Sequence, residues 1–449
     1  MRTGIFYAAL AALLVQPGIA VAKKPQPVPA APTPAPLPYE SAGLPTKGQV
    51  QAFYANWRYS PIWFKGTSPK PAVNDLVAIL QRAPLDGLSP GPQYATQVQA
   101  ALQQAASGTP QAIAFAEHTL SEALVLYAQV MERPASNYII AYPHLAPKAP
   151  TADQVLRTAA GAPSLELYLS QLANPNSIYT SIRDAAWRQM QASGSTAADP
   201  RVVANLDRAR IFPSTGRFAI VDSATQRLTM FENGKPVDSM KVVVGDAKPP
   251  MGLPTPMIAS MMYYVVYNPY WNVPHHLVRK MATNLASASY RKSKGYEIMS
   301  DWTADATPID PSTVDWQAVK DGKLQIRVRQ KPNDDDNSMG NMKFPFNNPE
   351  GIFLHDTPKK EYFLLASRDK SNGCVRLEDA TRFARWLLRS EPRPPSDGAE
   401  QFQQLPAGVP VYTTYLTAQV TDGQLAFVKD IYGWDPAGGG STQVAVGQR

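Results

Sequence analysis

Apolar residues recur at the spacing of an amphipathic helix through the first half of the chain. In residues 112–131, Phe115, Leu120, Leu124 and Tyr127 fall close to multiples of the 3.6-residue turn, so they would line one face of a helix. The same spacing predicts helices over residues 74–81, 164–172, 177–190 and 201–210. We therefore expect an N-terminal helical scaffold domain over residues 48–200, followed by a short connecting helix.

A dense group of large side chains opens this helical region. The segment F-Y-A-N-W-R-Y-S-P-I-W contains Phe53, Tyr54, Trp57, Ile62 and Trp63. Exposed aromatic rings can stack on sugars, but aromatic runs of this density more often form hydrophobic core. We interpret the group as core.

Hydrophobic runs of strand length replace the helical spacing after residue 200. Strands are predicted for R-F-A-I-V-D, R-L-T-M-F-E, D-S-M-K-V-V-V-G, M-M-Y-Y-V-V-Y and L-Q-I-R-V-R-Q. Asn233 and Gly234 separate the second run from the third, and both residues tolerate the positive φ of a tight hairpin turn. This pattern predicts a β-rich domain over residues 201–435 and hence an α+β multidomain fold.

The strand signals become sparse between residues 275 and 342. Residues 277–290 have helical spacing, residues 302–311 read as a loop, and residues 331–340 are strongly polar. The acidic triplet at 334–336 lacks the spaced ligands and the final Glu of a calcium loop, so we expect no metal there. An excursion of this length inside a β domain predicts an inserted cap.

The N-terminal segment resembles an export signal. Arg2 precedes a short apolar run at residues 5–15, and Ala20-Val21-Ala22 has the small-x-small pattern of a cleavage site. We expect residues 1–22 to be a signal peptide of a secreted or periplasmic protein, with a retained signal anchor as the alternative. Residues 23–47 are proline-rich and predict a semi-rigid linker, and residues 436–449 predict a flexible tail. No later stretch reaches the length of a membrane span.

Composition and charge narrow the function classes. The net charge of +7 is spread along the chain, with Lys and Arg interleaved with Asp and Glu. A nucleic-acid groove would instead concentrate basic and aromatic residues in one stripe. We therefore expect no nucleic-acid partner, and we expect a monomer.

Cys374 is the sole cysteine in the sequence, so it cannot form a disulfide within the chain. It is inert and buried, or it pairs between chains, or its sulfur reacts. A reactive Cys needs a base and backbone N–H groups to hold an oxyanion. His355, at the end of the strand-like I-F-L-H, is the candidate base, and the amides of Gly373 and Cys374 are candidate oxyanion donors.

The surroundings of Cys374 favour the reactive alternative. S-N-G-C runs into L-E-D-A-T-R-F-A-R-W-L-L, whose apolar spacing is helical. We expect Cys374 to lie just before a helix N-terminus, where the helix dipole and Arg376 would lower its pKa. The remaining histidines fall in the helical region (His118 and His144) or in the predicted cap (residues 275–276), and we expect packing or surface roles for them.

At these residues the chain resembles the L,D-transpeptidases with a YkuD-type catalytic domain. The family signature is a His, a spacer of roughly fifteen residues, then Ser/Thr-His-Gly-Cys, an apolar residue and Arg or Asn. Here His355 is followed by S-N-G-C-V-R at residues 371–376. The motifs N-L-D-R-A-R, V-V-V-G, N-P-Y-W-N-V-P, L-H-D-T-P, P-V-Y-T-T-Y and D-I-Y-G-W-D resemble the large subgroup with a helical scaffold.

Two residues depart from the family pattern. Asn372 replaces the usual second His of the signature, and Phe353 stands where many relatives have Tyr. The separate peptidoglycan-binding module of large relatives is not recognisable in the sequence.

The resemblance implies a peptidoglycan cross-linking enzyme of the cell envelope. Cys374 would attack the diaminopimelate carbonyl of a donor tetrapeptide, release D-Ala and form a thioester, with His355 as general base. The amine of an acceptor stem would then resolve the thioester to give a 3-3 cross-link, with no metal or organic cofactor. Carbapenem β-lactams would acylate the same Cys.

Supporting roles follow from the same resemblance. The residues that would orient His355 or hold the oxyanion are Gly373, Ser371, Asp356 and Asn372, and those that would bind substrate are Arg376, Trp271 and Tyr270. Three alternatives remain open from the sequence: an L,D-carboxypeptidase or endopeptidase that uses water, a variant that makes 1-3 links, and a non-catalytic wall-binding protein.

Overall fold

The computed structural model describes residues 40–57, 60–135, 137–248, 252–303, 305–332 and 336–436. The expected signal peptide (1–22), most of the expected linker (23–47) and tail (436–449), and two residues of the acidic triplet lie outside the described residues. Within the described ranges, no helix has both the length and the apolar character that crossing a membrane requires.

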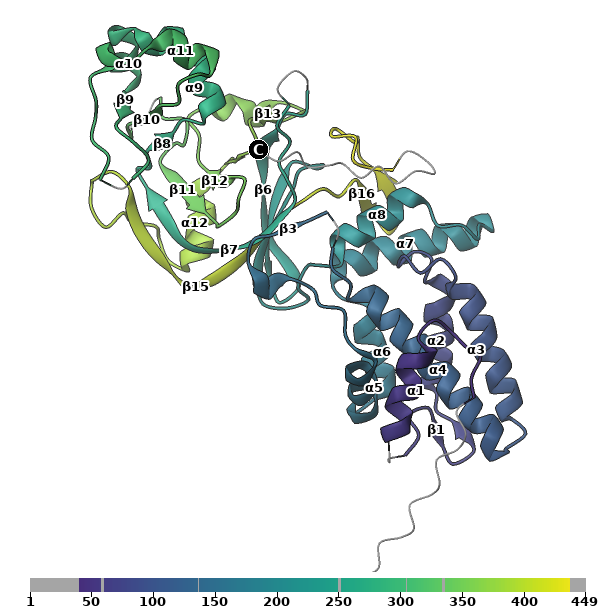
Figure 1. The fold of residues 1–449 in the computed structure, drawn as a ribbon. Helices are drawn as coiled ribbons and strands as arrows, with labels where there is room; N and C mark the ends of the chain where they lie inside the picture. The colour runs from purple at the N-terminus through teal and green to yellow at the C-terminus, as the bar shows by residue number, and fades with distance from the viewer. Residues whose placement is uncertain are drawn as a thin grey trace, which may run out of the picture. The chain divides into compact units, whose positions relative to one another are not determined.

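Helices make up the first part of the described chain, as the hydrophobic spacing predicted (Figure 1). They are α1 (Lys47–Asn56), α2 (Ala72–Arg82), α3 (Gly91–Ala105), α4 (Pro110–Met131), α5 (Ala152–Gly161), α6 (Leu165–Ala173), α7 (Ser177–Ser193) and α8 (Pro200–Ala209). Short extended pieces β1 (Phe64–Lys65), β2 (Ser68–Pro69) and β3 (Ile139–Ile140) and the 3₁₀ turn η1 (Pro143–Leu145) interrupt them.

The hydrophobic group at the start of this region lies in its core, as interpreted from the sequence. Phe53, Ile62 and Trp63 are buried. The backbone amides of Ile62 and Trp63 donate to the carboxylate of Glu117, at 2.5 and 3.0 Å. Glu117 is itself buried on α4, so it compensates amides that have no ladder partner.

The second part of the chain is rich in strands. They are β4 (Arg217–Asp222), β5 (Arg227–Glu232), β6 (Lys235–Gly245), β7 (Ile258–Tyr267), β11 (Met342–Pro345), β12 (Phe353–His355), β13 (Asp369–Ser371), β14 (Val375–Leu377), β15 (Gln401–Thr414), β16 (Ala418–Thr421) and β17 (Gln424–Phe427). Helix α12 (Ala380–Leu388) and the 3₁₀ turn η3 (Lys360–Leu364) lie between them in sequence. The α+β fold class is thereby confirmed.

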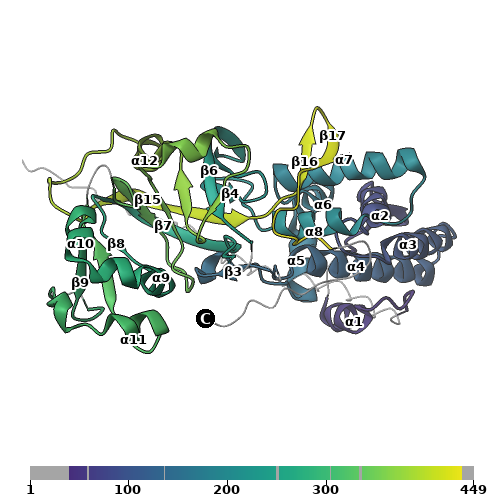
Figure 2. The ribbon, with the colours of Figure 1, turned by 90° about the horizontal axis from the view of Figure 1, so that it is seen from above.

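The main sheet has the strand order β11-β12-β14-β6-β5-β4-β15-β7-β3, with β13 paired to β6. Because β11 also pairs with β7, the sheet closes on itself like a barrel. Its interior is apolar and includes Val242, Leu354, Val375 and Phe383, the last contributed by α12. β16 and β17 form a separate hairpin beside α7 (Figure 2).

A small subdomain with its own core follows β7, in the part of the chain expected to form a cap. It comprises β8 (Trp271–Asn272), α9 (His275–Ala286), α10 (Ala288–Lys294), β9 (Tyr296–Met299), η2 (Pro311–Thr313), α11 (Trp316–Asp321) and β10 (Arg327–Gln330). The strands pair in the order β8-β10-β9, and Val278, Leu285 and Val328 are fully buried among them. The helix predicted over residues 277–290 is divided, because Ser287 ends α9 and caps α10 through its side chain.

Candidate active site

Two short parallel strands carry the residues of the predicted site. In β12 and β14, Leu354 lies opposite Val375, and His355 lies opposite Arg376. Leu354 and Val375 are fully buried in the core of the sheet. Because side chains alternate between the two faces of a strand, His355 and Arg376 point away from that core. Cys374 directly precedes β14, and the same alternation places its sulfur on the side of His355 and Arg376.

The His355 imidazole is buried and fixed in one orientation. Its Nδ1 atom lies 2.5 Å from the backbone carbonyl oxygen of Asp356. Because a carbonyl oxygen only accepts, we assign the proton to Nδ1, which leaves Nε2 unprotonated. Burial, together with the nearby Arg376 charge, lowers the pKa of His355 to about 4. The ring is therefore a neutral acceptor near neutral pH.

The Cys374 thiol is protonated in the resting site. Its side chain is partly exposed, and its sulfur lies 3.8 Å from the carbonyl oxygen of Gly351. Burial raises the pKa of Cys374, and this outweighs the lowering by a backbone hydrogen bond from Phe353 and by the Arg376 charge. The expectation of a lowered Cys pKa was therefore wrong.

The expected helix N-terminus at Cys374 was also wrong. β14 follows Cys374 directly, and α12 begins only at Ala380, after the N-cap Asp379. Val375 and Leu377 are both fully buried, which is the period-two pattern of a strand. The amphipathic spacing farther along was correct, but the helix begins too late for its dipole to act on the sulfur.

The loop before β14 is held by its own hydrogen bonds and by a buried threonine. The Ser371 hydroxyl donates to the Cys374 carbonyl at 2.6 Å and accepts from the Gly373 amide at 3.2 Å. The Thr255 hydroxyl donates to the Gly373 carbonyl at 2.7 Å and accepts from the Gly245 amide at 2.9 Å. Gly373 has a φ of 105°, which a side chain would strain.

Residues from the C-terminal segment continue this network. The Tyr432 hydroxyl donates to the Gly245 carbonyl at 2.8 Å and accepts from the Thr255 amide at 3.3 Å. The Tyr432 amide donates to the Tyr415 hydroxyl at 2.9 Å, and Arg208 of α8 donates to the Tyr415 carbonyl at 3.0 Å. The motifs that contain these residues gave no sign of this role in the sequence, because only the fold joins them into one network.

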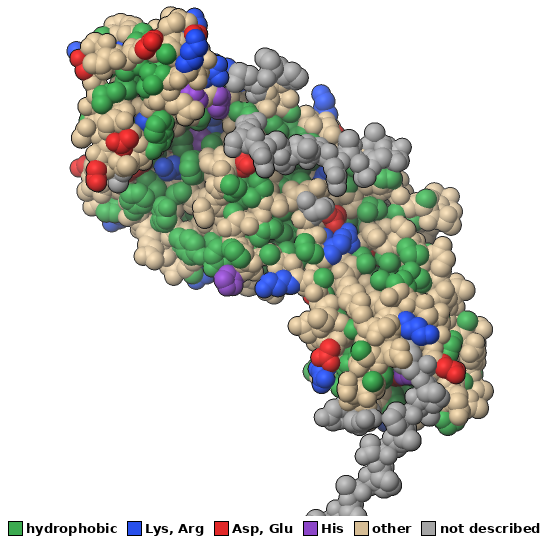
Figure 3. Space-filling view, in the orientation of Figure 1, with side chains coloured by type: hydrophobic (Ala, Val, Ile, Leu, Met, Phe, Trp, Pro, Cys, Tyr) green, Lys and Arg blue, Asp and Glu red, His purple; other side chains and the backbone are tan. Residues whose placement is uncertain are grey.

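Two cations flank the Cys374 and His355 pair. Arg376 lies over the Tyr362 ring at 5.4 Å, and Tyr362 also hydrogen-bonds its guanidinium. Lys343 of β11 is the register partner of His355 across the antiparallel pair with β12. The charges of both cations act on His355 and on Cys374. Figure 3 shows basic and histidine side chains in the recess between the cap and the sheet. Lys343 was not singled out from the sequence.

Several predicted site residues have other surroundings. Asn372 is exposed, and Ser371 bonds within its own loop. Among the described residues, neither side chain hydrogen-bonds to the ring of His355. Trp271 packs against the cap core, and the Tyr270 ring lies 4.2 Å beneath the Arg329 guanidinium. The Asp356 side chain pairs with Lys360 at 2.7 Å, while its backbone carbonyl is what contacts His355.

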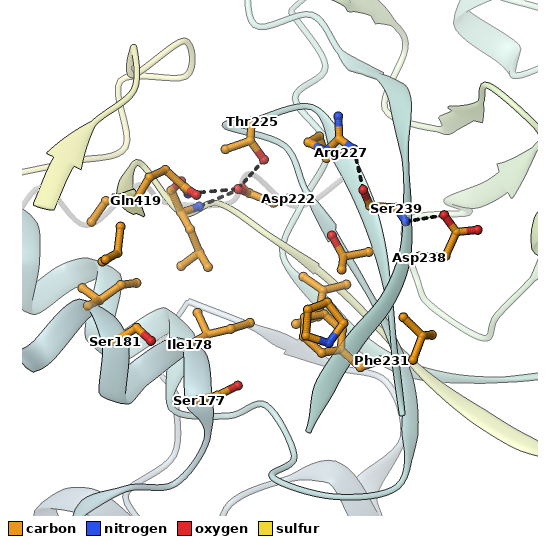
Figure 4. A pocket seen from close by; sticks show the side chains of 18 residues that line it. Ser177, Ile178, Ser181, Asp222, Thr225, Arg227, Phe231, Asp238, Ser239 and Gln419 are labelled. Carbon is orange, nitrogen blue, oxygen red and sulfur yellow. Dashed lines mark hydrogen bonds between the residues drawn. The ribbon is translucent and has the colours of Figure 1, made fainter. Parts of the chain in front are cut away.

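A separate hollow of about 670 Å³ lies between α7, the outer face of β4 to β6, and β16 (Figure 4). Asp222, Arg227, Ser239 and Gln419 are among its lining residues, whereas no residue of the predicted site is. Burial raises the pKa of Asp222 to about 6, although four donors surround its carboxylate. Within the described ranges, no cluster of three His, Cys, Asp or Glu side chains could hold a metal ion.

Comparison with known proteins identifies both parts of the chain. Residues 216–412 match the L,D-transpeptidase catalytic domain (YkuD), and residues 48–185 match a scaffold domain. A Haemophilus influenzae protein assigned provisionally to the L,D-transpeptidases is 25% identical over 403 residues. The aligned part covers 87% of this chain and 79% of that protein.

Solved structures give weaker likenesses. An L,D-transpeptidase from Mycobacterium smegmatis is 14% identical, with 44% of this chain and 58% of that chain covered and a TM-score of 0.19. An L,D-transpeptidase from Xylanimonas cellulosilytica is 14% identical, with 52% and 79% covered and a TM-score of 0.18. These values are too low for residue roles to be transferred.

The two domain matches and the curated relative agree with the signature around Cys374 and with the order of helical and β-rich regions in the fold. The family acts on peptidoglycan. The chain belongs to the L,D-transpeptidase family, with a YkuD-type catalytic domain preceded by a scaffold domain.

Proposed function

We propose that this protein cross-links peptidoglycan stem peptides through a thioester on Cys374. The observation that supports this proposal most directly is the shared face of β12 and β14. The strand register sets the Cys374 sulfur and the His355 ring on that face, with Nε2 as the open acceptor. A sulfur nucleophile with a positioned neutral base is the arrangement that acyl transfer requires.

In the first half-reaction, His355 Nε2 takes the thiol proton while the Cys374 sulfur bonds to the diaminopimelate carbonyl carbon of a donor tetrapeptide. The carbonyl carbon becomes tetrahedral, and its oxygen carries the negative charge. The C–N bond to the terminal D-Ala then breaks, and the imidazolium returns the proton to the leaving amine. The products are free D-Ala and a thioester.

In the second half-reaction, the side-chain amine of an acceptor diaminopimelate attacks the thioester. His355 takes one amine proton as the new C–N bond forms. The C–S bond then breaks, and the imidazolium returns the proton to the sulfur, which restores the thiol. The product is a 3-3 cross-link. If water enters in place of the amine, the same site is an L,D-carboxypeptidase or endopeptidase.

Backbone amides of the S-N-G-C loop would stabilise the oxyanion. The Gly373 amide is already bonded to the Ser371 hydroxyl, so it has to exchange partners before it can donate to a substrate oxygen. We therefore assign the main role to the Cys374 amide, in the arrangement typical of oxyanion holes. Carbapenems carry an activated carbonyl and would acylate the same sulfur. The membership of a cell-wall enzyme family supports action in the cell envelope, after export through residues 1–22.

The deciding experiment is incubation of the protein lacking residues 1–22 with disaccharide-tetrapeptide, followed by mass spectrometry. Cross-linked dimers that have lost one D-Ala support the transpeptidase, trimmed monomers indicate the hydrolase, and unchanged substrate favours a wall-binding protein. Cys374→Ala is the matched control. Full activity in that variant would overturn the proposal.

A further inference from the structure

The Arg376 side chain is half-buried and lacks a full set of hydrogen-bond partners. Its Nε and Nη1 atoms are both shielded from solvent and have no hydrogen-bond partner among the described residues. Tyr362 supplies one hydrogen bond and a ring face. A guanidinium has five N–H donors in a planar fork that matches a carboxylate, and buried donors without acceptors are costly. The charge of Glu361 acts on Arg376, but no carboxylate among the described residues forms an ion pair with it, so the guanidinium keeps donors for an external anion.

Lys343 lies on β11, two strands from Arg376 on β14, and His355 on β12 lies between them in the register. It faces His355 across the antiparallel pair of β11 and β12. Its nearest carboxylate is that of Glu400, at 3.7 Å, which is too long for a hydrogen bond. Its ammonium also lies 5.3 Å from the centre of the Phe353 ring. The Lys343 ammonium is mostly buried and only weakly paired. Together with Arg376, it therefore offers an anion a second positive charge.

We propose that Lys343 and Arg376 form a carboxylate subsite that recognises the terminal D-amino acid of the donor stem. This inference rests on the proposed function and specifies its donor. In a tetrapeptide, the carboxylate of the leaving D-Ala is separated from the scissile nitrogen by one carbon atom, so it enters the site together with the carbonyl that Cys374 attacks. Arg376 is two residues from Cys374 on the same face, which fits that short separation.

The subsite has a consequence for donor selection. A stem that continues beyond this D-Ala has an amide in place of the carboxylate, and an amide leaves both cations without a counter-charge. Specificity of this kind is large because the buried donors stay unpaired with the wrong substrate. The enzyme should therefore accept tetrapeptides and reject stems with a neutral group at the same position.

The test compares a tetrapeptide donor that ends in D-Ala with the same donor ending in D-alaninamide. For the wild-type protein, we expect kcat/KM to be about 30- to 100-fold higher with the free acid, as for loss of a charge-assisted hydrogen-bonded pair. In Lys343→Met and Arg376→Met, we expect this acid-to-amide ratio to fall below about 5, mainly through a higher KM for the acid.

Matched variants separate charge recognition from structural damage. Lys359→Met removes the same charge from an exposed side chain beside Tyr362 and should keep the wild-type ratio. Lys343→Arg keeps the charge and should keep most of the ratio, and thermal unfolding of each variant tests its fold. Equal use of acid and amide by the wild-type protein would overturn the subsite while leaving the proposed function intact. No turnover of either donor would instead count against the proposed function.

Discussion

Thr255 provides the most direct test of how the nucleophile loop is positioned. Its hydroxyl joins the Gly245 amide to the Gly373 carbonyl, at 2.9 and 2.7 Å, and the side chain is 1% exposed. Thr255→Val keeps the shape of the side chain and removes both hydrogen bonds. The variant therefore isolates the contribution of the hydroxyl to the loop that carries Cys374.

The expected magnitude follows from the two backbone groups that lose their partner. A buried donor or acceptor left without a partner costs about 1–3 kcal/mol, so the free energy of unfolding should fall by roughly 2–4 kcal/mol. That is a large part of the ~5–15 kcal/mol typical of a folded protein. Because the loop adjoins the sulfur, its displacement should also slow acylation of Cys374 by about 10- to 100-fold.

Urea unfolding and the rate of thioester formation, read by intact-protein mass spectrometry, measure the two effects. Thr255→Ser is the control, since it keeps the hydroxyl and loses only a methyl group, at about 1 kcal/mol. Valine and serine variants with the same stability and the same acylation rate would refute the reasoning, because the hydroxyl would then contribute nothing.

Three further predictions concern protonation, the C-terminal segment and the signature loop. The pKa of His355 is about 4, against an ordinary 6.5, so the folded state should lose about 3 kcal/mol of stability as the pH falls from about 6.5 to 4. In urea unfolding, the midpoints of wild type and His355→Gln should therefore converge as the pH approaches 4. The Arg208 guanidinium lies 2.8 Å from the buried carboxylate of Asp435. Arg208→Met removes this ion pair and should lower the free energy of unfolding, measured in urea, by about 3–5 kcal/mol. Asn372→His should change activity less than about threefold in the cross-linking assay, because the side chain is exposed.

The sequence predicted the elements of the fold where the conformational preferences of the residues agree with the tertiary structure. Asn233 and Gly234 adopt φ values of 51° and 74°, as their hairpin required. β15 was missed because Pro406, Gly408 and Pro410 interrupt its pattern. The structure accommodates them at a shift in the pairing register with β7, between Gln404 and Val409. A bulge of this kind depends on the partner strand and leaves no local signal.

α3 was missed for a different reason. Its start at Gly91 follows Ser89-Pro90, which reads as a turn, and the sequence therefore indicated an end rather than a beginning. A Cβ at Gly91 would lie 2.4 Å from the Leu80 carbonyl oxygen, so glycine permits α3 to begin against α2. This is a tertiary reason for the residue, and a single sequence does not display it.

For the site, the residue types and the signature motif in the sequence predicted Cys374 and His355, but not the residues that surround them. Thr255 contacts the loop at Gly373 across more than a hundred residues of sequence, and Tyr432 contacts Gly245 and Thr255 behind it. Lys343 is brought to His355 by the pairing register of β11 and β12. The pKa of Cys374 was misjudged because burial, which raises it, can be read only from packing.

The protonation state of the resting pair constrains how the chemistry begins. Burial raises the pKa of the Cys374 thiol, while burial and the Arg376 charge lower the pKa of His355 to about 4. Both shifts disfavour the thiolate–imidazolium pair relative to the neutral thiol and imidazole. In the proposed mechanism we therefore expect proton transfer to Nε2 and attack by sulfur to occur together, once a carbonyl carbon is in place. A site of this kind keeps its thiol unreactive toward solutes that lack the geometry of the substrate, because only a bound donor supplies the electrophile and the oxyanion contact in the same step.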